Sequence, residues 1–311
     1  MMPRTVAPRL KTLDRPALLM NLPLSLATDE PNNILMQQMS DAERLIDHRK
    51  ALHQFTELYH FLAQRAVVYL LPSTPKLQDQ AYVANLGIVL PHLRDETVVV
   101  SRFRSTPRLA EAPVGIDFFN LMHFHVHLPP ERGADGEALY FEGEADLKYL
   151  RDDIYIGAHG LRTSLNALAW FSQSFGMKII PYRIADEYLY HLDCCLFVID
   201  AENVILCRDR TNEVTLRAIE RECNVVEASV ENVRSGLTNS LIIGQYLLCD
   251  SPISEISRTH DYYESEKAKI ARLEEISVQH GLELRIFNLS EFMKSGAALS
   301  CLAMRLNHVR G

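Results

Sequence analysis

Short apolar runs and longer helical repeats of apolar residues alternate along most of this chain. Runs of branched and aromatic residues are typical of strands, whereas apolar residues recurring every three or four positions indicate helices. One strand–strand–helix–strand order is predicted at 139–142, 154–157, 164–175 and 178–182. A second copy follows at 195–199, 204–207, 213–222 and 225–226. The same order therefore recurs in consecutive segments.

Two weaker copies extend this recurrence. One lies around 82–90 with 98–103, and the other lies around 241–248 with a charged helix at 262–280. A repeated supersecondary unit of this size predicts a closed array of α/β modules rather than a doubly wound sheet. No linker or low-complexity stretch divides the chain, so we expect one domain over residues 1–311.

The N-terminal part of the chain contains a predicted strand and a predicted long helix. Basic residues from Arg4 to Arg15 precede an apolar stretch at 16–27, which loosely resembles a signal peptide. Two prolines and an asparagine interrupt that stretch, so a first buried strand is favoured over a targeting segment. Ser40 and Asp41 are favourable N-cap residues for the helix. Its apolar positions are Leu45, Leu52, Phe55, Leu58 and Leu62.

Composition and charge narrow the class of protein. Apolar residues make up 47% of the chain and charged residues 23%, which allows a sizeable core and excludes disordered and collagen-like classes. The formal net charge of -8 argues against a nucleic-acid binder, because such affinity comes from clustered Lys and Arg. A cationic small substrate suits this sign better. The six cysteines form no C-x-x-C pair, and no run spans a bilayer, so a cytoplasmic location is expected.

One cysteine stands out because chemistry could be built around it. Cys301 follows a loop of small residues and enters a final apolar strand. Such a cysteine is more often a core residue, and a nucleophile would need a base and an orienting acid from elsewhere in the chain. His191 and Asp193 are expected on one face of a strand. Glu142 is expected at a strand end, where Gly143 would let it approach a ligand, although a solvated turn is the simpler interpretation.

Four polar residues stand at comparable places in successive modules. They are Asn85, Glu142, His191 and Asn239. Equivalent positions in a closed pseudo-symmetric array point towards one axis. We therefore expect these side chains to converge on a single pocket, which scattered surface turns would not form.

Five ordered motifs resemble those of the guanidine-modifying enzymes of the pentein superfamily. The motifs are Asp79-x-x-Tyr-Val-Ala-Asn85, Phe141-Glu-Gly-x-x-Asp146, Gly160-Leu-Arg-Thr-Ser164, Tyr190-His-Leu-Asp193 and Cys301-Leu. That superfamily includes arginine deiminases, dimethylargininases, amidinotransferases and arginine dihydrolases. The resemblance implies a five-bladed pseudo-symmetric α/β propeller with its site on the axis, in agreement with the repeated modules.

The resemblance also implies a catalytic group. Cys301 would be the nucleophile, His191 the proton carrier and Glu142 the acid that pairs with His191. The thiolate would attack the guanidinium carbon and form a covalent amidino-cysteine, so that neither a metal nor an organic cofactor is required. The implied partner is a small guanidino compound, with no nucleic acid and no membrane. A homo-oligomer remains open.

Five further residues are implied to hold the substrate. Asp79 and Asp193 would clamp the guanidinium group. Arg162 and Arg104 would receive the substrate's carboxylate, because guanidinium forks bind carboxylates bidentately. Asn85 stands where deiminases have aspartate, and its Ala-Asn context is more similar to arginine dihydrolases, which favours ornithine and ammonia as products.

Alternatives remain open at this point. An amidinotransferase would pass the amidino group to an amine instead of water, and a catalytically silent module would bind arginine without turnover. The loop before Cys301 keeps a single glycine where many relatives have a glycine-rich run, and residues 21–36 match their counterparts poorly. Both departures concern how the substrate is contacted.

Two other patterns have simpler interpretations. His123, His125 and His127 share one strand face and could bind zinc, but apolar residues fill the other face, as in any half-exposed strand. The helix at 262–280 carries opposite charges at helical spacing, which predicts a solvated face.

Overall fold

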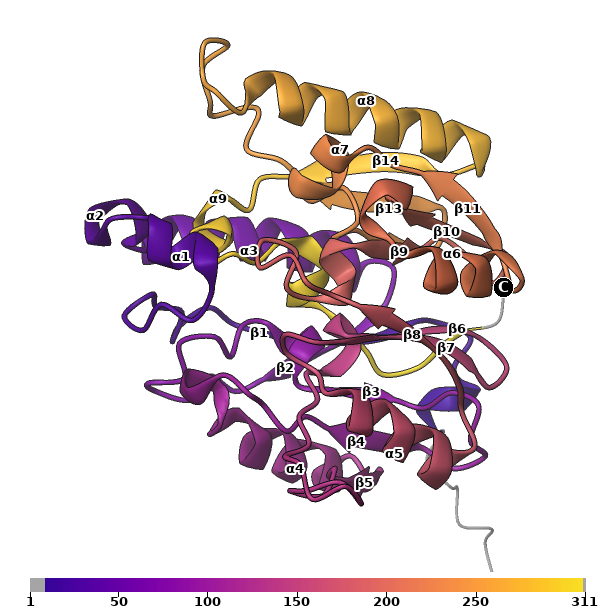
Figure 1. The fold of residues 1–311 in the computed structure, drawn as a ribbon. Helices are drawn as coiled ribbons and strands as arrows, with labels where there is room; N and C mark the ends of the chain where they lie inside the picture. Colours follow the sequence, from indigo (N-terminus) through magenta and orange to yellow (C-terminus); the bar gives the residue numbers. More distant parts are fainter. Residues whose placement is uncertain (1–8, 310–311) are drawn as a thin grey trace, which may run out of the picture.

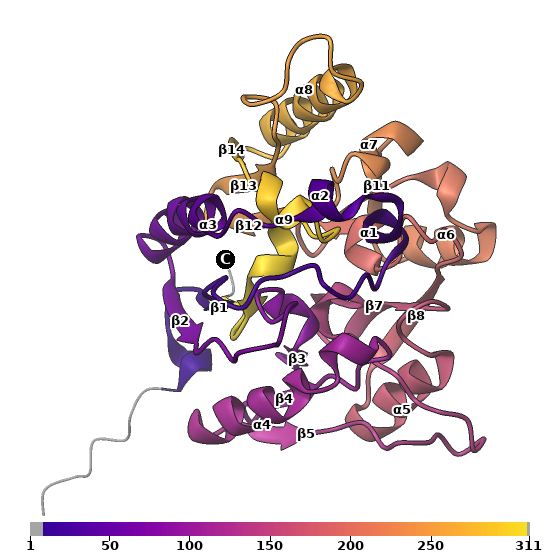
Figure 2. The same ribbon diagram turned by 90° about the vertical axis from the view of Figure 1, so that its left-hand side faces the viewer.

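The protein is built from five small sheets, each of three strands. The structure, a computed structural model, describes residues 9–309. Strands lie towards the centre, and helices lie around the periphery, where α8 forms one outer edge (Figure 1). A view turned by 90° separates α3, α4, α5 and α8 around the C-terminal segment at the centre (Figure 2). This arrangement confirms the predicted five-module α/β architecture.

One module illustrates how each sheet forms. β6 (Leu147–Arg151) pairs antiparallel with β7 (Ile154–His159), and α5 (Leu165–Phe175) then leads to β8 (Lys178–Arg183). β8 pairs parallel with β7, which requires a crossover connection such as this helix. Gly176 ends α5 with a left-handed φ of 67°. The last two strands and the helix predicted for this module are confirmed.

Three further modules repeat the same order. They are β3 (Gly87–Val89), β4 (Thr97–Val100), α4 (Glu111–Leu121) and β5 (His125–His127); β9 (Leu196–Val198), β10 (Asn203–Leu206), α6 (Glu213–Glu220) and β11 (Asn224–Glu227); and β12 (Leu241–Ile243), β13 (Tyr246–Asp250), α8 (Tyr263–Gln279) and β14 (Glu283–Phe287). In each, the first strand pair is antiparallel and the second is parallel. The middle strands are rich in branched residues, and β4 is buried throughout, as such sequences favour.

The two ends of the described chain form the fifth module. β1 (Ala17–Asn21) pairs antiparallel with β15 (Met304–Arg305) and parallel with β2 (Val67–Leu71). α3 (His48–Ala63) lies between β1 and β2 in the sequence and takes the place of the crossover helix. Every residue of β1 is buried, which confirms the predicted first strand, while Arg4 lies outside the described residues.

The single long helix predicted from Ser40 onwards is wrong, because two separate caps divide it. α2 (Asp41–Arg44) begins at Ser40 in a capping box with Glu43 and ends after one turn. Asp47 then accepts hydrogen bonds from two backbone N–H groups and starts α3. Leu45 falls between the caps and is 71% exposed. The other short helices of the described chain are α1 (Ile34–Gln38), α7 (Val230–Arg234) and α9 (Ser290–Met293).

Two predicted strands are also wrong, and the predicted solvated face of one helix has buried exceptions. Residues 139–142 form no strand, and Phe141 makes only an isolated bridge to Arg102. Residues 191–193 do not form a strand, because His191 leads into a one-turn 3-10 helix. The helix α8 is confirmed, but its Lys269 is fully buried instead of solvated. None of the helices within residues 9–309 is long and apolar enough to cross a membrane.

Candidate active site

One-turn 3-10 helices bring polar residues to the centre of the propeller. They are η2 (Val83–Asn85), η4 (Gly143–Ala145), η5 (Leu192–Cys194) and η7 (Leu299–Leu302). Gly143 has a φ of 68°, and a Cβ atom there would lie 2.4 Å from the carbonyl oxygen of Ala84. Glycine is therefore required for η2 and η4 to pack together. This corrects the expectation that Gly143 serves to approach a ligand.

Asn85, Glu142 and His191 meet at this centre, as their places in the modules predicted. His191 Nε2 lies 2.9 Å from Glu142 Oε2 and 3.3 Å from Asn85 Nδ2. All three side chains are buried. Because an ionised carboxylate only accepts hydrogen bonds, Nε2 carries the proton that faces Glu142, and Nδ1 is the ring nitrogen available for proton transfer.

The surroundings of Glu142 keep it ionised. Burial alone would raise its pKa, but the hydrogen bond from His191 and the positive charge of Arg162 outweigh burial and lower the pKa to about 2. Arg162 Nη1 lies 3.5 Å from Glu142 Oε2, and the backbone N–H of Arg104 donates to Oε1 at 3.2 Å. An anion held in this way orients the imidazole of His191.

A second buried acid, Asp146, connects the segments that carry Glu142 and His191. It accepts hydrogen bonds from Thr163 Oγ1 at 2.6 Å and from the backbone N–H of Leu192 at 3.1 Å. Thr163 Oγ1 in turn accepts from the backbone N–H of Glu142 at 3.1 Å. Burial raises the pKa of Asp146 to about 6. Asp146 therefore fixes the backbone on both sides of the imidazole–carboxylate pair.

Cys301 lies in η7 and is buried beside a carboxylate and an amide. Its Sγ lies 3.8 Å from Asp193 Oδ2 and 3.6 Å from Asn239 Nδ2. Burial and the negative charge of Asp193 raise the pKa of the Cys301 thiol to about 12, although hydrogen bonds from the Ala298 backbone and from Asn239 act in the opposite direction. The thiol is therefore protonated at neutral pH while this environment is unchanged.

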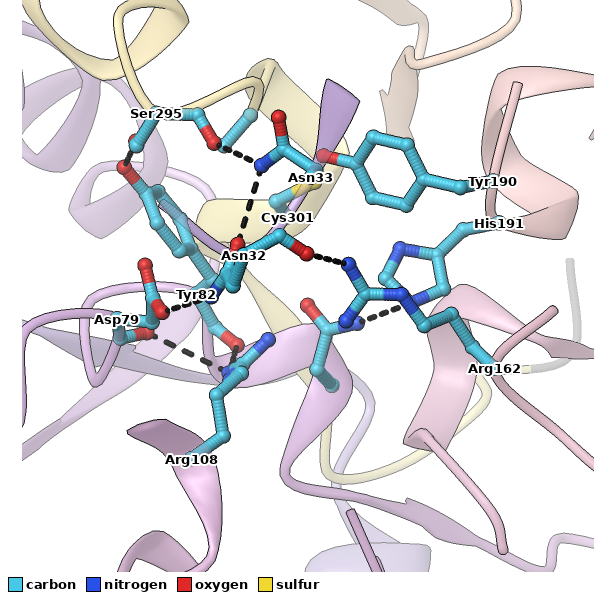
Figure 3. A pocket seen from close by; sticks show the side chains of 12 residues that line it. Asn32, Asn33, Asp79, Tyr82, Arg108, Arg162, Tyr190, His191, Ser295 and Cys301 are labelled. Atoms are coloured by element: carbon cyan, nitrogen blue, oxygen red, sulfur yellow. Dashed lines mark hydrogen bonds between the residues drawn. The ribbon is translucent and has the colours of Figure 1, made fainter. Parts of the chain in front are cut away.

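A single cavity joins Cys301 to His191. Its lining comprises Asn32, Asn33, Asp79, Tyr82, Asn85, Arg108, Arg162, Tyr190, His191, Ser295, Ala297 and Cys301. Figure 3 shows Asp79 and Arg162 on opposite sides of Asn32. Asp193 is not among the lining residues, but its contact with the sulfur places it directly behind Cys301.

In the N-terminal segment, Asn32 contacts one side of the cavity with its side-chain amide and the other side with its backbone carbonyl. Asn32 Nδ2 donates to Asp79 Oδ2 at 2.6 Å, and the carbonyl oxygen of Asn32 accepts from Arg162 Nη2 at 2.7 Å. The first contact is the same kind of N–H to carboxylate bond that a guanidinium group would make. Asn33 Nδ2 donates to the carbonyl oxygen of Ser295 at 2.9 Å and joins this segment to the loop before Cys301.

One of the two predicted arginines lies in the cavity and the other does not. Arg162 lines it, with its guanidinium carbon 5.1 Å from the centre of the Tyr190 ring. The Arg104 side chain is exposed and donates to the carbonyl oxygen of Leu161, so only its backbone N–H reaches the site. The Arg104 side chain does not line the cavity, which corrects the assignment of this residue.

Arg108 lines the cavity where Arg104 was expected, and the sequence motifs did not identify it. It is 4% exposed and forms a bidentate ion pair with Glu111, with N–O distances of 2.9 and 2.8 Å. Its Nη2 also donates to the carbonyl oxygen of Tyr82 at 3.0 Å. Within the described chain no partner is found for Nη1, which leaves that group for a ligand (Figure 3). An Arg–Glu pair three residues apart was the signal that could have indicated a buried cation.

The alternative zinc site is not assembled. Across residues 9–309 no three His, Cys, Asp or Glu side chains are grouped to hold a metal ion. His125 and His127 are exposed on β5, and His123 precedes the strand with a φ of 62°. A half-exposed strand therefore explains these imidazoles.

Comparisons with known proteins agree with this geometry. The sequence model of one family, described as N,N dimethylarginine dimethylhydrolase, eukaryotic, matches residues 23–275. An uncharacterized protein of Caenorhabditis elegans is 27% identical over 264 residues, which cover 84% of this chain and 85% of that protein. The bifunctional arginine dihydrolase/ornithine cyclodeaminase ArgZ of Synechocystis is 25% identical over 83% of this chain, but the match spans only 33% of ArgZ.

Solved structures confirm the propeller fold. The substrate-bound N-terminal domain of ArgZ covers 95% of this chain and is itself covered completely, with a TM-score of 0.79 and 22% identity. A dimethylarginine dimethylaminohydrolase adduct with S-methyl-L-thiocitrulline covers 94% of this chain and is 99% covered, with a TM-score of 0.68 and 16% identity. The predicted five-bladed pentein architecture is thereby confirmed.

Proposed function

Because the chain belongs to the family described as eukaryotic N,N dimethylarginine dimethylhydrolase, we propose that it hydrolyses a guanidinium C–N bond of arginine or a substituted arginine. One observation carries this proposal: a buried thiol and an imidazole–carboxylate pair meet in a cavity that also contains carboxylate and guanidinium groups. A single catalytic domain over residues 1–311 would perform the reaction.

The cavity offers complementary charges to both ends of an arginine. Asp79, at the cavity wall, and Asp193, behind the sulfur, would hold the guanidinium cation and localise its charge. Arg162 and Arg108 would bind the carboxylate, since both guanidinium groups line the cavity and Nη1 of Arg108 is free within the described chain. Arg108 thus receives the role that the sequence assigned to Arg104.

The substrate cation would itself activate the sulfur. In the substrate-free protein, burial and Asp193 raise the pKa of the Cys301 thiol to about 12. A guanidinium placed beside the sulfur would offset the charge of Asp193 and favour the thiolate. Positioning the guanidinium carbon about 3 to 3.5 Å from the sulfur would then remove much of the entropic barrier to attack.

Two bond exchanges complete the hydrolysis. As the Cys301 sulfur forms a C–S bond to the guanidinium carbon, its proton passes to Nδ1 of His191. His191 then delivers this proton to the nitrogen that leaves as the C–N bond breaks. His191 then takes a proton from water, whose oxygen adds to the same carbon while the C–S bond breaks. Glu142 keeps the imidazole oriented through both steps. The resulting product is a ureido compound and an amine.

Asn85 favours a second hydrolysis over release of the ureido product. Its amide can both donate and accept hydrogen bonds, and it lies 3.3 Å from His191 Nε2. A neutral ureido group would therefore be retained for another attack by Cys301. The second hydrolysis releases the guanidinium carbon as carbon dioxide, so arginine gives ornithine, carbon dioxide and two ammonia molecules. An amidinotransferase would share every step up to the covalent intermediate and differ in the acceptor.

Product identification tests this function directly. The purified protein is incubated with arginine, methylated arginines, agmatine and guanidino acids, with and without glycine, and the products are separated by chromatography. We expect ornithine and ammonia from arginine, unchanged by glycine or by EDTA. Guanidinoacetate formed from glycine would establish the transferase instead, and no turnover together with arginine binding would establish the silent module. Equal turnover of agmatine would remove the carboxylate role given to Arg108 and Arg162.

A further inference from the structure

A buried asparagine outside the five family motifs contacts the reactive sulfur. Asn239 lies between α7 and β12, is 3% exposed and is fixed by a backbone hydrogen bond to the carbonyl oxygen of Gly236 at 3.0 Å. Its amide meets two consecutive residues of η7, Ser300 and Cys301. Asn239 thus reaches the nucleophile from a neighbouring module.

The contacts to Ser300 determine which end of the amide faces the sulfur. Asn239 Oδ1 accepts from the backbone N–H of Ser300 at 2.9 Å and also lies 2.9 Å from Ser300 Oγ, whose single proton is shared with Asp193. A backbone N–H can only donate, so the oxygen of the amide must be the atom on that side. The Nδ2 atom is thereby the end of the amide that can donate to Cys301 Sγ, 3.6 Å away, while Oδ1 lies 3.8 Å from the same sulfur and can accept only from the protonated thiol.

The sulfur needs such a donor because its other polar neighbour is a carboxylate. Asp193 Oδ2 lies 3.8 Å from Cys301 Sγ and also accepts from Ser300 Oγ at 2.9 Å. While the thiol is protonated, its S–H can point at Asp193. Once that proton leaves, two negative charges face each other in a buried place, and hydrogen bonds to the sulfur must offset their repulsion.

We infer that Asn239 is a catalytic residue that holds the Cys301 sulfur in position and stabilises its thiolate through the Nδ2 amide. This inference rests on the proposed role of Cys301 as nucleophile. The neutral amide is suited to this task because it donates to the thiolate without adding a charge. Its oxygen accepts from the backbone N–H of Ser300 and thereby holds η7 in place. The backbone of Ala298 supplies a second hydrogen bond to the same sulfur.

The variant Asn239→Asp separates an action on the sulfur from a purely structural role. Aspartate has the same shape and still accepts from Ser300 N and Oγ, but it replaces the donor to sulfur with an anion. We expect alkylation of Cys301 by iodoacetamide at a fixed alkaline pH to slow about tenfold or more, since one pKa unit is a factor of ten in thiolate. We also expect kcat to fall more than KM rises. Adducts at Cys301 are quantified by peptide mass spectrometry.

A neighbouring variant and a second substitution keep the test decisive. Ser240→Ala, in which the lost hydroxyl bonds only to the carbonyl oxygen of Leu237, should leave alkylation unchanged. Should Asn239→Asp not fold, Asn239→Ala removes the donor without adding charge and should slow alkylation to a smaller extent. Wild-type alkylation and kcat in either folded variant would overturn the inference. Alkylation requires no turnover, so activity retained by Cys301→Ser would refute the proposed function separately.

Discussion

Two buried charged clusters in this protein differ in how completely their polar groups are paired. On α8, at the outer edge of the molecule in Figure 1, Lys269 donates to the carbonyl oxygens of Ser235 and Asp250 at 2.8 and 2.9 Å. Its ammonium group also lies 2.8 Å from Glu266 Oε2, so all three of its N–H bonds have a partner. At the axis, Arg108 keeps an unpaired Nη1 within the described chain, and the Cys301 sulfur faces a carboxylate.

The difference distinguishes charge that supports the fold from charge that performs chemistry. Removing one partner of a fully hydrogen-bonded buried ion pair destabilises the fold, because the other charge is left uncompensated. A buried group that has a free hydrogen-bond donor or a neighbour of like charge is stabilised when a ligand supplies the missing partner. Substitutions in the α8 cluster should therefore change stability, whereas substitutions at the axis should change activity.

The largest effect is expected at the sulfur. Cys301→Ser should lower turnover by more than about a thousandfold, because an alcohol at this position lacks the nucleophilicity of a thiolate. The melting temperature should stay close to that of the wild type, and arginine should still bind. Product formation, calorimetry and a binding titration measure these quantities. Cys207→Ser, in another module, is the matched control and should remain active; substantial turnover by Cys301→Ser would exclude a covalent mechanism.

The converse result is expected on α8. Lys269→Met should lower the free energy of unfolding by about 3 to 5 kcal/mol, because Glu266 is left as an uncompensated buried charge. Urea unfolding measures this change, and kcat per folded molecule should be retained. Lys267→Met is the control: Lys267 is exposed on the same helix and lies 3.9 Å from Glu264, so its loss should change stability by less than about 0.5 kcal/mol. Equal effects of the two substitutions would contradict the contrast.

Glu142→Gln should lower both the activity and the stability of the protein. We expect kcat to fall about a hundredfold or more, because the imidazole loses its orienting anion. The folded-state pKa of Glu142, about 2, lies below its ordinary value of 4.5, so the ionised carboxylate stabilises the fold above pH 4.5 and this contribution is lost as pH falls towards 2. Calorimetry from pH 2 to 6 should show the wild-type advantage over the variant shrinking on acidification. An advantage that is constant with pH would mean that Glu142 is not ionised in the fold.

The smallest change is expected at Asn85, where a single atom distinguishes two reactions. Asn85→Asp should shift the product from ornithine towards citrulline about tenfold or more, because a carboxylate cannot donate a hydrogen bond to a neutral ureido group. Chromatography of the products measures the ratio. Asn307→Asp, a buried asparagine distant in sequence, serves as the control and should leave the ratio unchanged. Citrulline as the sole wild-type product would overturn the dihydrolase assignment and leave the Cys301 chemistry intact.

The sequence was informative wherever function depends on repeated geometry. The strand–helix–strand order followed from apolar periodicity. The module positions of Asn85, Glu142 and His191 predicted their convergence, and His191 Nε2 lies 2.9 Å from Glu142 Oε2 and 3.3 Å from Asn85 Nδ2. Their catalytic and binding roles remain predictions that the experiments above test. The family motif that contains Glu142 also contains Asp146. Asp146 accepts hydrogen bonds from Thr163 and Leu192 and so fixes the backbone near the imidazole–carboxylate pair.

Residues that depend on tertiary contacts could not be found in this way. Arg104 and Arg108 are four residues apart, and hydrogen bonds to the carbonyl oxygens of Asp79 and Tyr82, distant in sequence, help to hold Arg108 inward. Lys269 occupies one of several similar charged positions, and its burial depends on carbonyl groups at Ser235 and Asp250. Periodicity identifies which face of an element is apolar, but it does not identify a charge that the surrounding fold has paired.

The closing sheet has a consequence for how the protein folds. β1 pairs with β15 through Leu18 opposite Arg305 and Leu19 opposite Met304, and the side chain of Asn307 accepts from the backbone N–H of Ala17 at 2.7 Å. The strand that follows the sulfur-bearing turn is therefore held by a segment 290 residues away in the sequence. Contacts within a module are local and can form early in folding, whereas a contact of this separation forms late. Cys301 thus reaches its final place only when β15 has paired with β1, so the closing of the propeller also completes the reactive centre.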